Sequence, residues 1–301
     1  MKKGLLGILL TAGLAAGLLT GCGRSTETSD SAQTTEKAAA ANGESAGKAR
    51  TLEEIKEDGK IKIGVFSDKN PFGYVDENGK EQGYDVYFAR RIAKDLLGSE
   101  DDVEFVYVEA ASRVEYLKSA KVDIILANFT VTDERAEQVD FALPYMKVAL
   151  GVVSPEKALI ASVDDLKGKK LIVVKGTTAE AYFGENYPDI DLIKFDEYQE
   201  AYDALLDGRG DAFSTDNTEV LAWARQNEGF AVGVESLGDI DTIAPAVRKG
   251  NTELKNWLNE EIKALADEQF FHADFDATLK EAYGDSIDSE RIVVEGGVVE
   301  E

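Results

Sequence analysis

The sequence predicts an α/β protein with two doubly wound sheets, placed in two lobes that are joined by two hinge strands. Short apolar runs alternate with helical patterns in the order β-α-β-α-β up to about residue 127, an order typical of a parallel sheet with helices on both faces. The alternation starts again after an apolar run at 148–153, and a return strand expected at 242–247 brings C-terminal sequence back to the first lobe. About 250 residues suffice for two domains of ordinary size.

We assign the first lobe to residues 51–147 plus 245–284. Asp85 and Thr132 are each placed to cap a helix, and Ser112 and Glu115 have the spacing of a capping box. Apolar periodicity defines the other elements. The expected strands lie at 61–66, 103–108 and 122–127, and helices are expected to begin near residues 52, 85, 114 and 132.

The second lobe is assigned to residues 148–244 on the same grounds. The expected strands lie at 148–153, 171–174, 191–195, 211–215 and 230–234, and the helices at 179–186, 198–206 and 217–223. An amphipathic helix at 251–267 follows the return strand. No element is assigned to the acidic tail at 285–301.

The first 22 residues predict an exported lipoprotein. Lys2 and Lys3 precede an apolar run at 4–19, which is shorter than a membrane span. The run leads to Leu-Thr-Gly before Cys22, the only cysteine, so the chain has no disulfide or cysteine-based metal site of its own. We expect a lipidated Cys22 to anchor the protein outside the cytoplasm, on the bacterial membrane. A plain secretory signal is the alternative.

Two further features of composition limit the function. Residues 23–50 are rich in Ser, Thr, Ala and Glu and hold no aromatic residue, which is typical of a flexible tether. The formal charge of −25 becomes −27 when the signal peptide and its two lysines are removed. So acidic a chain argues against binding nucleic acid or docking electrostatically on anionic lipid.

The stretch 123–135 carries the first candidate site. A buried strand ends at Ala127, and Asn128 and Thr130 follow it before a helix begins at Thr132. Arg135 lies one turn into that helix. A strand end that meets a helix N-terminus offers backbone N–H groups, a positive dipole and a forked guanidinium, which together suit a carboxylate. An ordinary turn with a surface arginine is the plain alternative.

The second lobe repeats this arrangement. Thr177 and Thr178 precede one helix, and Asp216 lies at the end of a strand. Ligands of open α/β sheets bind at the carboxyl ends of strands. A carboxylate held by Arg135, with an ammonium held by Asp216, describes a free α-amino acid. Alternatively, the two threonines and Asp216 only cap helices.

Six motifs in order carry a resemblance to a known family. They are Ile-Gly-Val-Phe-Ser-Asp-Lys-Asn-Pro-Phe-Gly-Tyr (63–74), Gly-Tyr-Asp-Val (83–86), Ala-Asn-Phe-Thr-Val-Thr-Asp-Glu-Arg (127–135), Val-Asp-Phe-Ala-Leu-Pro-Tyr (139–145), Lys-Gly-Thr-Thr-Ala-Glu (175–180) and Thr-Asp-Asn (215–217). The chain resembles the amino-acid-binding branch of the bacterial extracellular solute-binding proteins, the receptors of ABC importers. The resemblance implies a two-lobed periplasmic-binding-protein (type II) fold, a monomer without cofactor or metal, and a permease with its ATPase as partners.

The resemblance also implies roles for single residues. Thr130 and Arg135 would bind the α-carboxylate of the ligand, and Asp216 its α-ammonium, with help from the Asn128 carbonyl. Thr178 would close on the carboxylate from the second lobe. The residues expected to touch the ligand are Phe66, Arg113, Asn128, Phe129, Thr130, Arg135, Thr177, Thr178 and Asp216.

The resemblance further ranks the ligands. Arg113 occupies the place of an arginine that meets the ligand side chain in binders of acidic amino acids; a solvated arginine is the alternative. The whole pattern is most similar to cysteine-binding members, so cysteine ranks before glutamate or aspartate, and cystine follows. Lys69 and Asn70, in the loop after the first strand, depart from some relatives.

A different class of function is an enzyme on the same fold, such as a dehydratase. The single histidine, His272, lies past the return strand and is expected to be a packing residue rather than a base.

Overall fold

The computed structural model describes residues 47–299, without the side chain of Ser286. The predicted signal peptide, Cys22, most of the tether and residues 300–301 lie outside the described residues. Among residues 47–299 there is no helix both long and apolar enough to cross a membrane.

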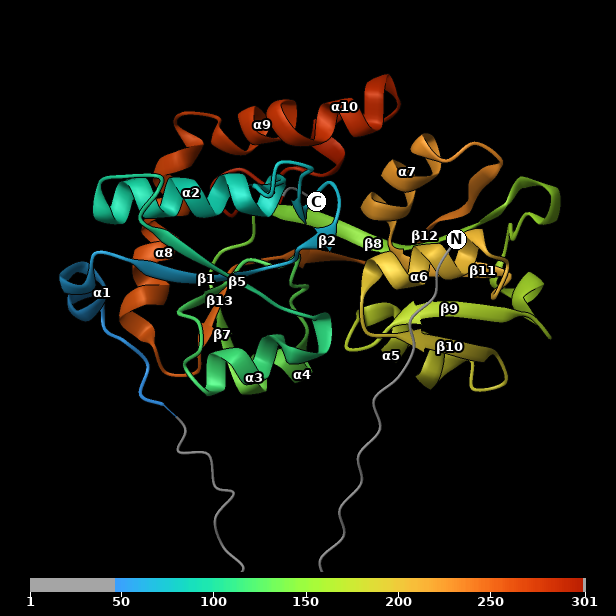
Figure 1. Cartoon of the computed structure of the whole chain (residues 1–301), viewed down its shortest axis with the longest axis horizontal. Helices are drawn as coiled ribbons and strands as arrows, with labels where there is room; N and C mark the ends of the chain where they lie inside the picture. The colour runs from blue at the N-terminus through green and yellow to red at the C-terminus, as the bar shows by residue number, and fades with distance from the viewer. Residues whose placement is uncertain (1–46, 300–301) are drawn as a thin grey trace, which may run out of the picture. The chain divides into compact units, whose positions relative to one another are not determined.

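The first lobe contains a five-stranded sheet with helices on both faces (Figure 1). Its strand order is β5 (Val103–Tyr107), β1 (Ile61–Val65), β6 (Ile124–Ile125), β13 (Ala246–Arg248) and β7 (Val139–Phe141). β1 pairs in parallel with β5 and β6, whereas β13 runs antiparallel to β6 and β7. The sheet is therefore mixed, because the chain re-enters it from the opposite end after the second lobe.

Adjacent residues of β6 bury into different cores because strand side chains alternate between faces. Ile124 belongs to the core that includes Ile63 and Phe88, and Ile125 to the core that includes Leu117. Figure 1 shows α2 (Tyr84–Leu97) on one face and α3 (Arg113–Lys118) and α4 (Asp133–Gln138) on the other. The remaining helical elements of this lobe are α1 (Leu52–Asp58), α8 (Thr252–Ala266), α9 (Phe270–Asp274) and α10 (Lys280–Tyr283).

The second lobe contains the other five-stranded sheet. Its strand order is β10 (Asp191–Phe195), β9 (Lys170–Val174), β11 (Ala212–Asp216), β8 (Met146–Pro155) and β12 (Phe230–Ile243). The first three strands are parallel, and β8 and β12 are antiparallel neighbours. Its helices are α5 (Thr178–Asn186), α6 (Tyr198–Leu206) and α7 (Asn217–Gln226). The predicted α/β fold with two sheets is confirmed, with both sheets mixed rather than purely parallel.

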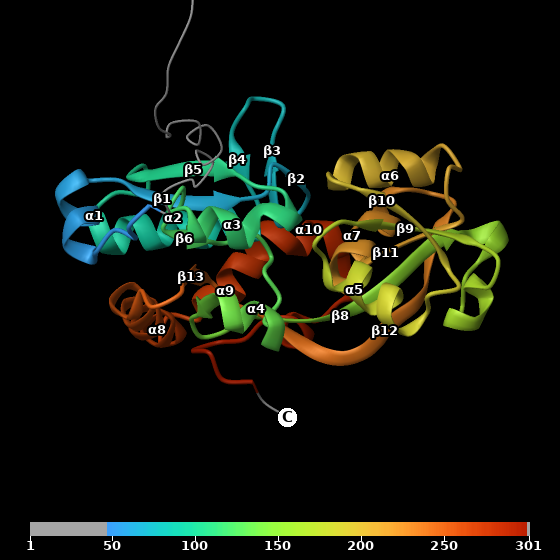
Figure 2. The same cartoon turned by 90° about the horizontal axis from the view of Figure 1, so that it is seen from below.

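Strands β8 and β12 connect the lobes (Figures 1 and 2). They pair from Phe230 opposite Pro155 to Ile243 opposite Met146, with three shifts of register. The sequence predicts strands at 230–234 and 242–247 instead of one strand that ends at Ile243. The polar stretch between them stays extended because it pairs along β8, and bulges absorb its irregular spacing.

Two capping predictions for the first lobe are wrong. Gly83 is the N-cap of α2, and Asp85, in the first turn, accepts hydrogen bonds from elsewhere. The Ser112 hydroxyl bonds to Glu109 around the 3₁₀ turn η1 (Ala110–Ser112) rather than capping α3. In contrast, the predicted cap by Thr132 is present, since its hydroxyl accepts from the Arg135 backbone.

The C-terminal segment packs onto the folded part although the sequence assigns no element to it. Ile292, Val293 and Val294 are buried, and Val293 bridges to Met146 at the start of β8. The Lys147 backbone N–H donates to the carbonyl of Ile292 over 2.6 Å. This segment therefore supports the hinge from one side.

We predict that Val293→Ala lowers the free energy of unfolding by about 2 kcal/mol, because it removes two buried methyl groups and leaves a cavity. Val298→Ala is the matched control, since Val298 is 66% exposed and its truncation should change stability by less than about 0.5 kcal/mol. Urea unfolding followed by circular dichroism measures both. Equal midpoints for the two variants would contradict a packed C-terminal segment.

Candidate functional site

Two arginines of the first lobe converge on one backbone carbonyl of the second. Arg113 and Arg135 each donate a hydrogen bond from Nη2 to the carbonyl oxygen of Gly176, over 3.0 and 2.9 Å. Within residues 47–299, neither guanidinium forms an ion pair; the arginines that do are others. Two neighbouring cations that share a neutral acceptor are an incomplete site for an anion.

The close approach of the lobes requires a glycine at this position. Gly176 has φ +73°, and a Cβ there would lie 2.4 Å from the Cα of Ala111 in the first lobe. No larger residue fits without moving the backbone. Gly176 therefore lets a lobe 2 carbonyl reach both guanidinium groups.

The environment of the arginine pair disfavours its positive charge. Burial and the neighbouring Arg135 lower the pKa of Arg113 to about 9, and burial lowers the pKa of Arg135. The ring of Phe129 partly offsets this cost, with its centroid 4.4 Å from Cζ of Arg113 and 4.8 Å from Cζ of Arg135. A bound carboxylate would reverse the effect of burial, because it would supply the missing opposite charge.

A buried lysine forms the other end of the site. Lys69, on β2 (Asp68–Lys69), is 1% exposed, and its Nζ lies 3.1 Å from Asp216 Oδ2 and 3.0 Å from Glu219 Oε2. The same ammonium donates to Asn128 Oδ1 over 2.8 Å and contacts the Tyr198 hydroxyl at 3.2 Å. Lys69 comes from the first lobe, whereas Asp216 and Glu219 come from the second. The ion pairs therefore cross between the lobes.

The charges of this cluster depend on one another. Burial opposes the charged form of Lys69, but the carboxylates of Asp216 and Glu219 outweigh it and raise the pKa of the lysine above its usual range. Burial also raises the pKa of Glu219 to about 7, although Lys69 counteracts the rise. Glu219 is thus the acid of this cluster that can lose its charge near neutral pH.

Lys69 is held by a small sheet that the sequence does not predict. β2 pairs with β3 (Gly73–Val75), which pairs with β4 (Glu81–Gln82). The neighbouring Asp68 accepts from the backbone N–H groups of Tyr198 and Gln199, over 2.7 and 3.2 Å, and so caps α6 from the other lobe. Both residues of β2 therefore reach across to the second lobe.

Asn128 connects the arginine pair to the lysine cluster. Its carbonyl oxygen accepts from Arg113 Nη1 over 3.2 Å, and its side-chain oxygen accepts from Lys69. Asn128 has φ +45°, and its backbone N–H donates to Asp85 Oδ2 over 2.7 Å, which fixes this unusual conformation. Its buried Nδ2 has no partner among the described residues and remains free to donate. Burial raises the pKa of Asp85 to about 6.

The three threonines differ in the freedom of their hydroxyl groups. Thr177 caps α5, because its hydroxyl donates to the Val174 carbonyl over 2.6 Å and accepts from the Glu180 N–H. Within the described residues, the hydroxyls of Thr130 and Thr178 make no hydrogen bond. The alternative that these threonines only cap a helix therefore holds for Thr177. The hydroxyl groups of Thr130 and Thr178 remain available as hydrogen-bond donors. The Asp216 carboxylate forms no cap to α7.

The structure joins most of the residues predicted from sequence in one network of contacts with Lys69. Thr177 and Thr178 follow Gly176 in the chain, and within residues 47–299 their side chains make no hydrogen bond with this network. Phe66 and Phe129 are 1% exposed, and the Phe66 ring meets that of Tyr198 edge to face at 5.2 Å. Lys69 appears in the sequence only as an unusual loop residue, and no local pattern marks it as buried. Its contacts depend on residues more than 50 positions away.

This arrangement offers one end to an anion and the other to a cation. The arginine pair lacks a carboxylate partner, and Asp216 presents a carboxylate whose present partner is the side chain of Lys69. A zwitterion that spans Asn128 would satisfy both ends at once.

No group of His, Cys, Asp and Glu side chains within residues 47–299 is arranged to hold a metal ion. His272, on α9, contacts Glu295 Oε1 at 2.9 Å and Glu290 Oε1 at 3.0 Å. It therefore links the C-terminal segment to the first lobe rather than entering the cluster around Asn128.

Comparison with known proteins identifies the family of this chain. The model of the bacterial extracellular solute-binding proteins, family 3, matches residues 61–273. A glutamine-binding protein of an ABC transporter from Bacillus subtilis is 32% identical over 244 residues, covering 80% of this chain and 89% of that protein.

Two solved structures are more similar in sequence. The cysteine-binding protein of Campylobacter jejuni is 56% identical with a TM-score of 0.80, covering 81% of this chain and 98% of that one. A solute receptor for L-cysteine from Neisseria gonorrhoeae is 54% identical with a TM-score of 0.80, covering 82% and 100%. The chain therefore belongs to the bacterial extracellular solute-binding proteins, family 3, and is a binding protein rather than an enzyme.

Proposed function

We propose that this protein captures one free amino acid, L-cysteine as the first candidate, and delivers it to the permease and ATPase of an ABC importer. The observation that carries this proposal is the pair of guanidinium groups, Arg113 and Arg135, that lack a carboxylate partner within the described residues. Asp216 completes the match at the opposite end. Two cysteine-binding proteins at 56% and 54% identity support the choice of ligand.

Each end of the ligand has its own set of partners. Arg135 and the hydroxyl of Thr130 bind the α-carboxylate, and the hydroxyl of Thr178 closes on it from the second lobe. Asp216 binds the α-ammonium. The rings of Phe66 and Phe129 form apolar walls.

Lys69 has a defined part in this mechanism. Its ammonium lies against Asp216, the position that the ligand α-ammonium requires. The arriving ligand displaces Lys69 from Asp216, and Lys69 keeps Glu219 and Asn128 as partners. The ligand favours the closed arrangement only to the extent that its contacts there are stronger than the Lys69 contacts that it replaces.

Arg113 restricts the ligand side chain. Four of its hydrogen bonds go to backbone carbonyls, those of Ala110, Ala127, Asn128 and Gly176. One of its five N–H donors is left for a ligand. A small, polarisable side chain such as that of cysteine fits one donor better than the carboxylate of glutamate or aspartate, or the longer cystine.

The location follows from the N-terminal sequence. We propose that Cys22 is lipidated and anchors a monomeric receptor outside the cytoplasm, through the tether at 23–50, with lobe boundaries at 147/148 and 244/245. Metabolic labelling with a radioactive fatty acid tests the anchor, and Cys22→Ser should abolish incorporation.

We predict one-to-one binding of L-cysteine when refolded residues 47–301 are titrated calorimetrically against the amino acids and cystine under reducing and non-reducing conditions. Refolding from denaturant removes any copurified ligand. Binding of glutamate or aspartate in place of cysteine would agree with an amino-acid receptor but would show that cysteine is not its ligand. Failure of every amino acid would overturn the proposed function.

We predict that Arg135→Ala and Asp216→Ala each weaken binding by about 2–5 kcal/mol, because each leaves one ligand charge buried and unpaired. Arg209→Ala is the control, since Arg209 is an exposed arginine in a loop of the second lobe. Calorimetry measures the three affinities, and thermal unfolding shows that each variant folds. Wild-type affinity in both site variants would exclude the two-ended arrangement.

We predict that Lys69→Met makes the unliganded protein more open, because the variant loses the ion pairs from β2 to Asp216 and Glu219 across the lobes. Small-angle X-ray scattering should show a larger radius of gyration without ligand and a wild-type value with it. Lys80→Met, at an exposed turn, should change neither value. A wild-type radius for unliganded Lys69→Met would show that Lys69 does not hold the lobes together.

A further inference from the structure

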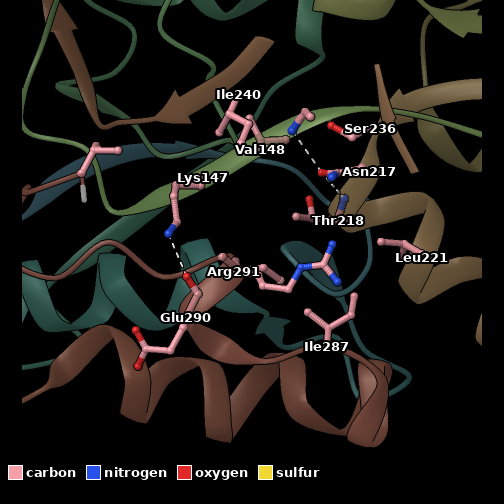
Figure 3. A pocket seen from close by; sticks show the side chains of 13 residues that line it. Lys147, Val148, Asn217, Thr218, Leu221, Ser236, Ile240, Ile287, Glu290 and Arg291 are labelled. Carbon is pink, nitrogen blue, oxygen red and sulfur yellow. Dashed lines mark hydrogen bonds between the residues drawn. The ribbon is translucent and has the colours of Figure 1, made fainter. Parts of the chain in front are cut away.

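A second cavity lies beside the hinge strands. Its volume is about 640 Å³, which is within the usual range for sites of small molecules. Its walls come from three places: the hinge strands β8 and β12, the first turns of α7, and the C-terminal segment around Arg291 (Figure 3). The lining residues include neither of the two arginines nor Lys69. This cavity is therefore separate from the amino-acid site.

One buried hydroxyl in this cavity has no partner. Thr218, in the first turn of α7, is 3% exposed, and its Oγ1 makes no hydrogen bond with any described residue. Its backbone groups are occupied, because the N–H donates to Asn217 Oδ1 and the carbonyl accepts from the Tyr283 hydroxyl. A buried hydroxyl without a partner costs free energy unless a ligand or water binds it.

An unpaired guanidinium faces the same space. The Arg291 side chain extends from the C-terminal segment toward α7, between Thr218 and Ile287 in the view of Figure 3. Its guanidinium forms no ion pair with a carboxylate of residues 47–299. The nearby Lys147 ammonium donates to the Glu290 carbonyl over 2.7 Å, and the Glu290 carboxylate contacts His272 instead. Arg291 is exposed, and in a chain of formal charge −25 an arginine left unpaired at the edge of a cavity can attract an anion.

The rest of the wall combines apolar side chains with the polar ones of Lys147, Asn217, Ser236 and Glu290. Val148 and Ile292 are buried and Leu221 is partly buried, whereas Ile240, beside Val148 in Figure 3, is exposed. Such walls suit an aliphatic body, whereas a single guanidinium beside a hydroxyl suits a planar group with one negative charge. Phosphate would bring a second charge toward the Glu290 carboxylate, and the other cation of the lining, Lys147, already donates to the Glu290 carbonyl. We propose that this cavity binds a small aliphatic monocarboxylate, with its carboxylate on Arg291 and the Thr218 hydroxyl and its body against Val148 and Leu221.

The test uses the full mature chain and two-dimensional ¹H–¹⁵N NMR titrations with sodium butyrate and sodium isovalerate. We expect saturable shifts at Lys147, Thr218 and Ser236, which line the cavity, with and without cysteine present. Arg291→Gln should weaken binding by about tenfold or more, because the charge-assisted hydrogen bonds are lost. Thr218→Val should weaken it less. The neutral isovaleramide should bind weakly or not at all.

Two controls separate this site from general charge effects. Arg209→Gln changes the net charge equally on an exposed loop and should keep wild-type carboxylate binding. Arg291→Gln should keep wild-type cysteine affinity. A negative result for carboxylate binding in this cavity can therefore be distinguished from a negative result for the proposed amino-acid binding.

Several outcomes would overturn the proposal. Equal carboxylate binding by wild type and Arg291→Gln would show that Arg291 does not bind the carboxylate. Absence of saturable shifts in the wild type would show that the cavity does not bind carboxylates. Tighter binding of inorganic phosphate would assign a different ligand class. Binding that appears only after removal of residues 300–301, which follow the cavity residue Val299, would show that the chain itself competes for the cavity.

Discussion

The buried ammonium of Lys69 sets the constraint on which the arrangement of the two lobes depends. A charge that is 1% exposed is tolerated only with partners of opposite charge and full hydrogen bonding. Lys69 finds these partners in the other lobe, at Asp216 and Glu219, while its neighbour Asp68 caps α6 there. The sheets of the two lobes are separate, and only the connecting chain segments run between them. The two residues of β2 therefore add contacts that hold the lobes together.

The arginine pair shows the opposite situation, a charge kept without its partner. Arg113 and Arg135 share the carbonyl of Gly176, and burial lowers the pKa of both. Backbone carbonyls and the Phe129 ring hold the guanidinium groups in position before an anion arrives. Such preorganisation reduces the free energy that ligand binding must supply for ordering side chains. The burial that disfavours the two positive charges thus also makes this position suitable for a carboxylate.

Helix α7 connects the proposed amino-acid site to the hinge. Asp216 and Glu219, at its start, contact Lys69, whereas Thr218 and Leu221, on another side, line the cavity beside β8 and β12. The hinge strands are long and irregular in register, and the C-terminal segment covers part of them through Val293. A small change in the position of α7 would therefore alter both proposed sites.

The sequence by itself determined the local features of this protein. Buried strands show as apolar runs, and Thr132 caps its helix, because both depend on neighbours within a few residues. The sequence also identified the candidate ligand-binding residues at 127–135 and Asp216, because they lie where the end of a strand meets the start of a helix. Only the tertiary structure decided that Asp85 anchors Asn128 instead of capping a helix, and that Lys69 is buried. Their partners lie 43 or more positions away, and no local pattern encodes such distant pairing.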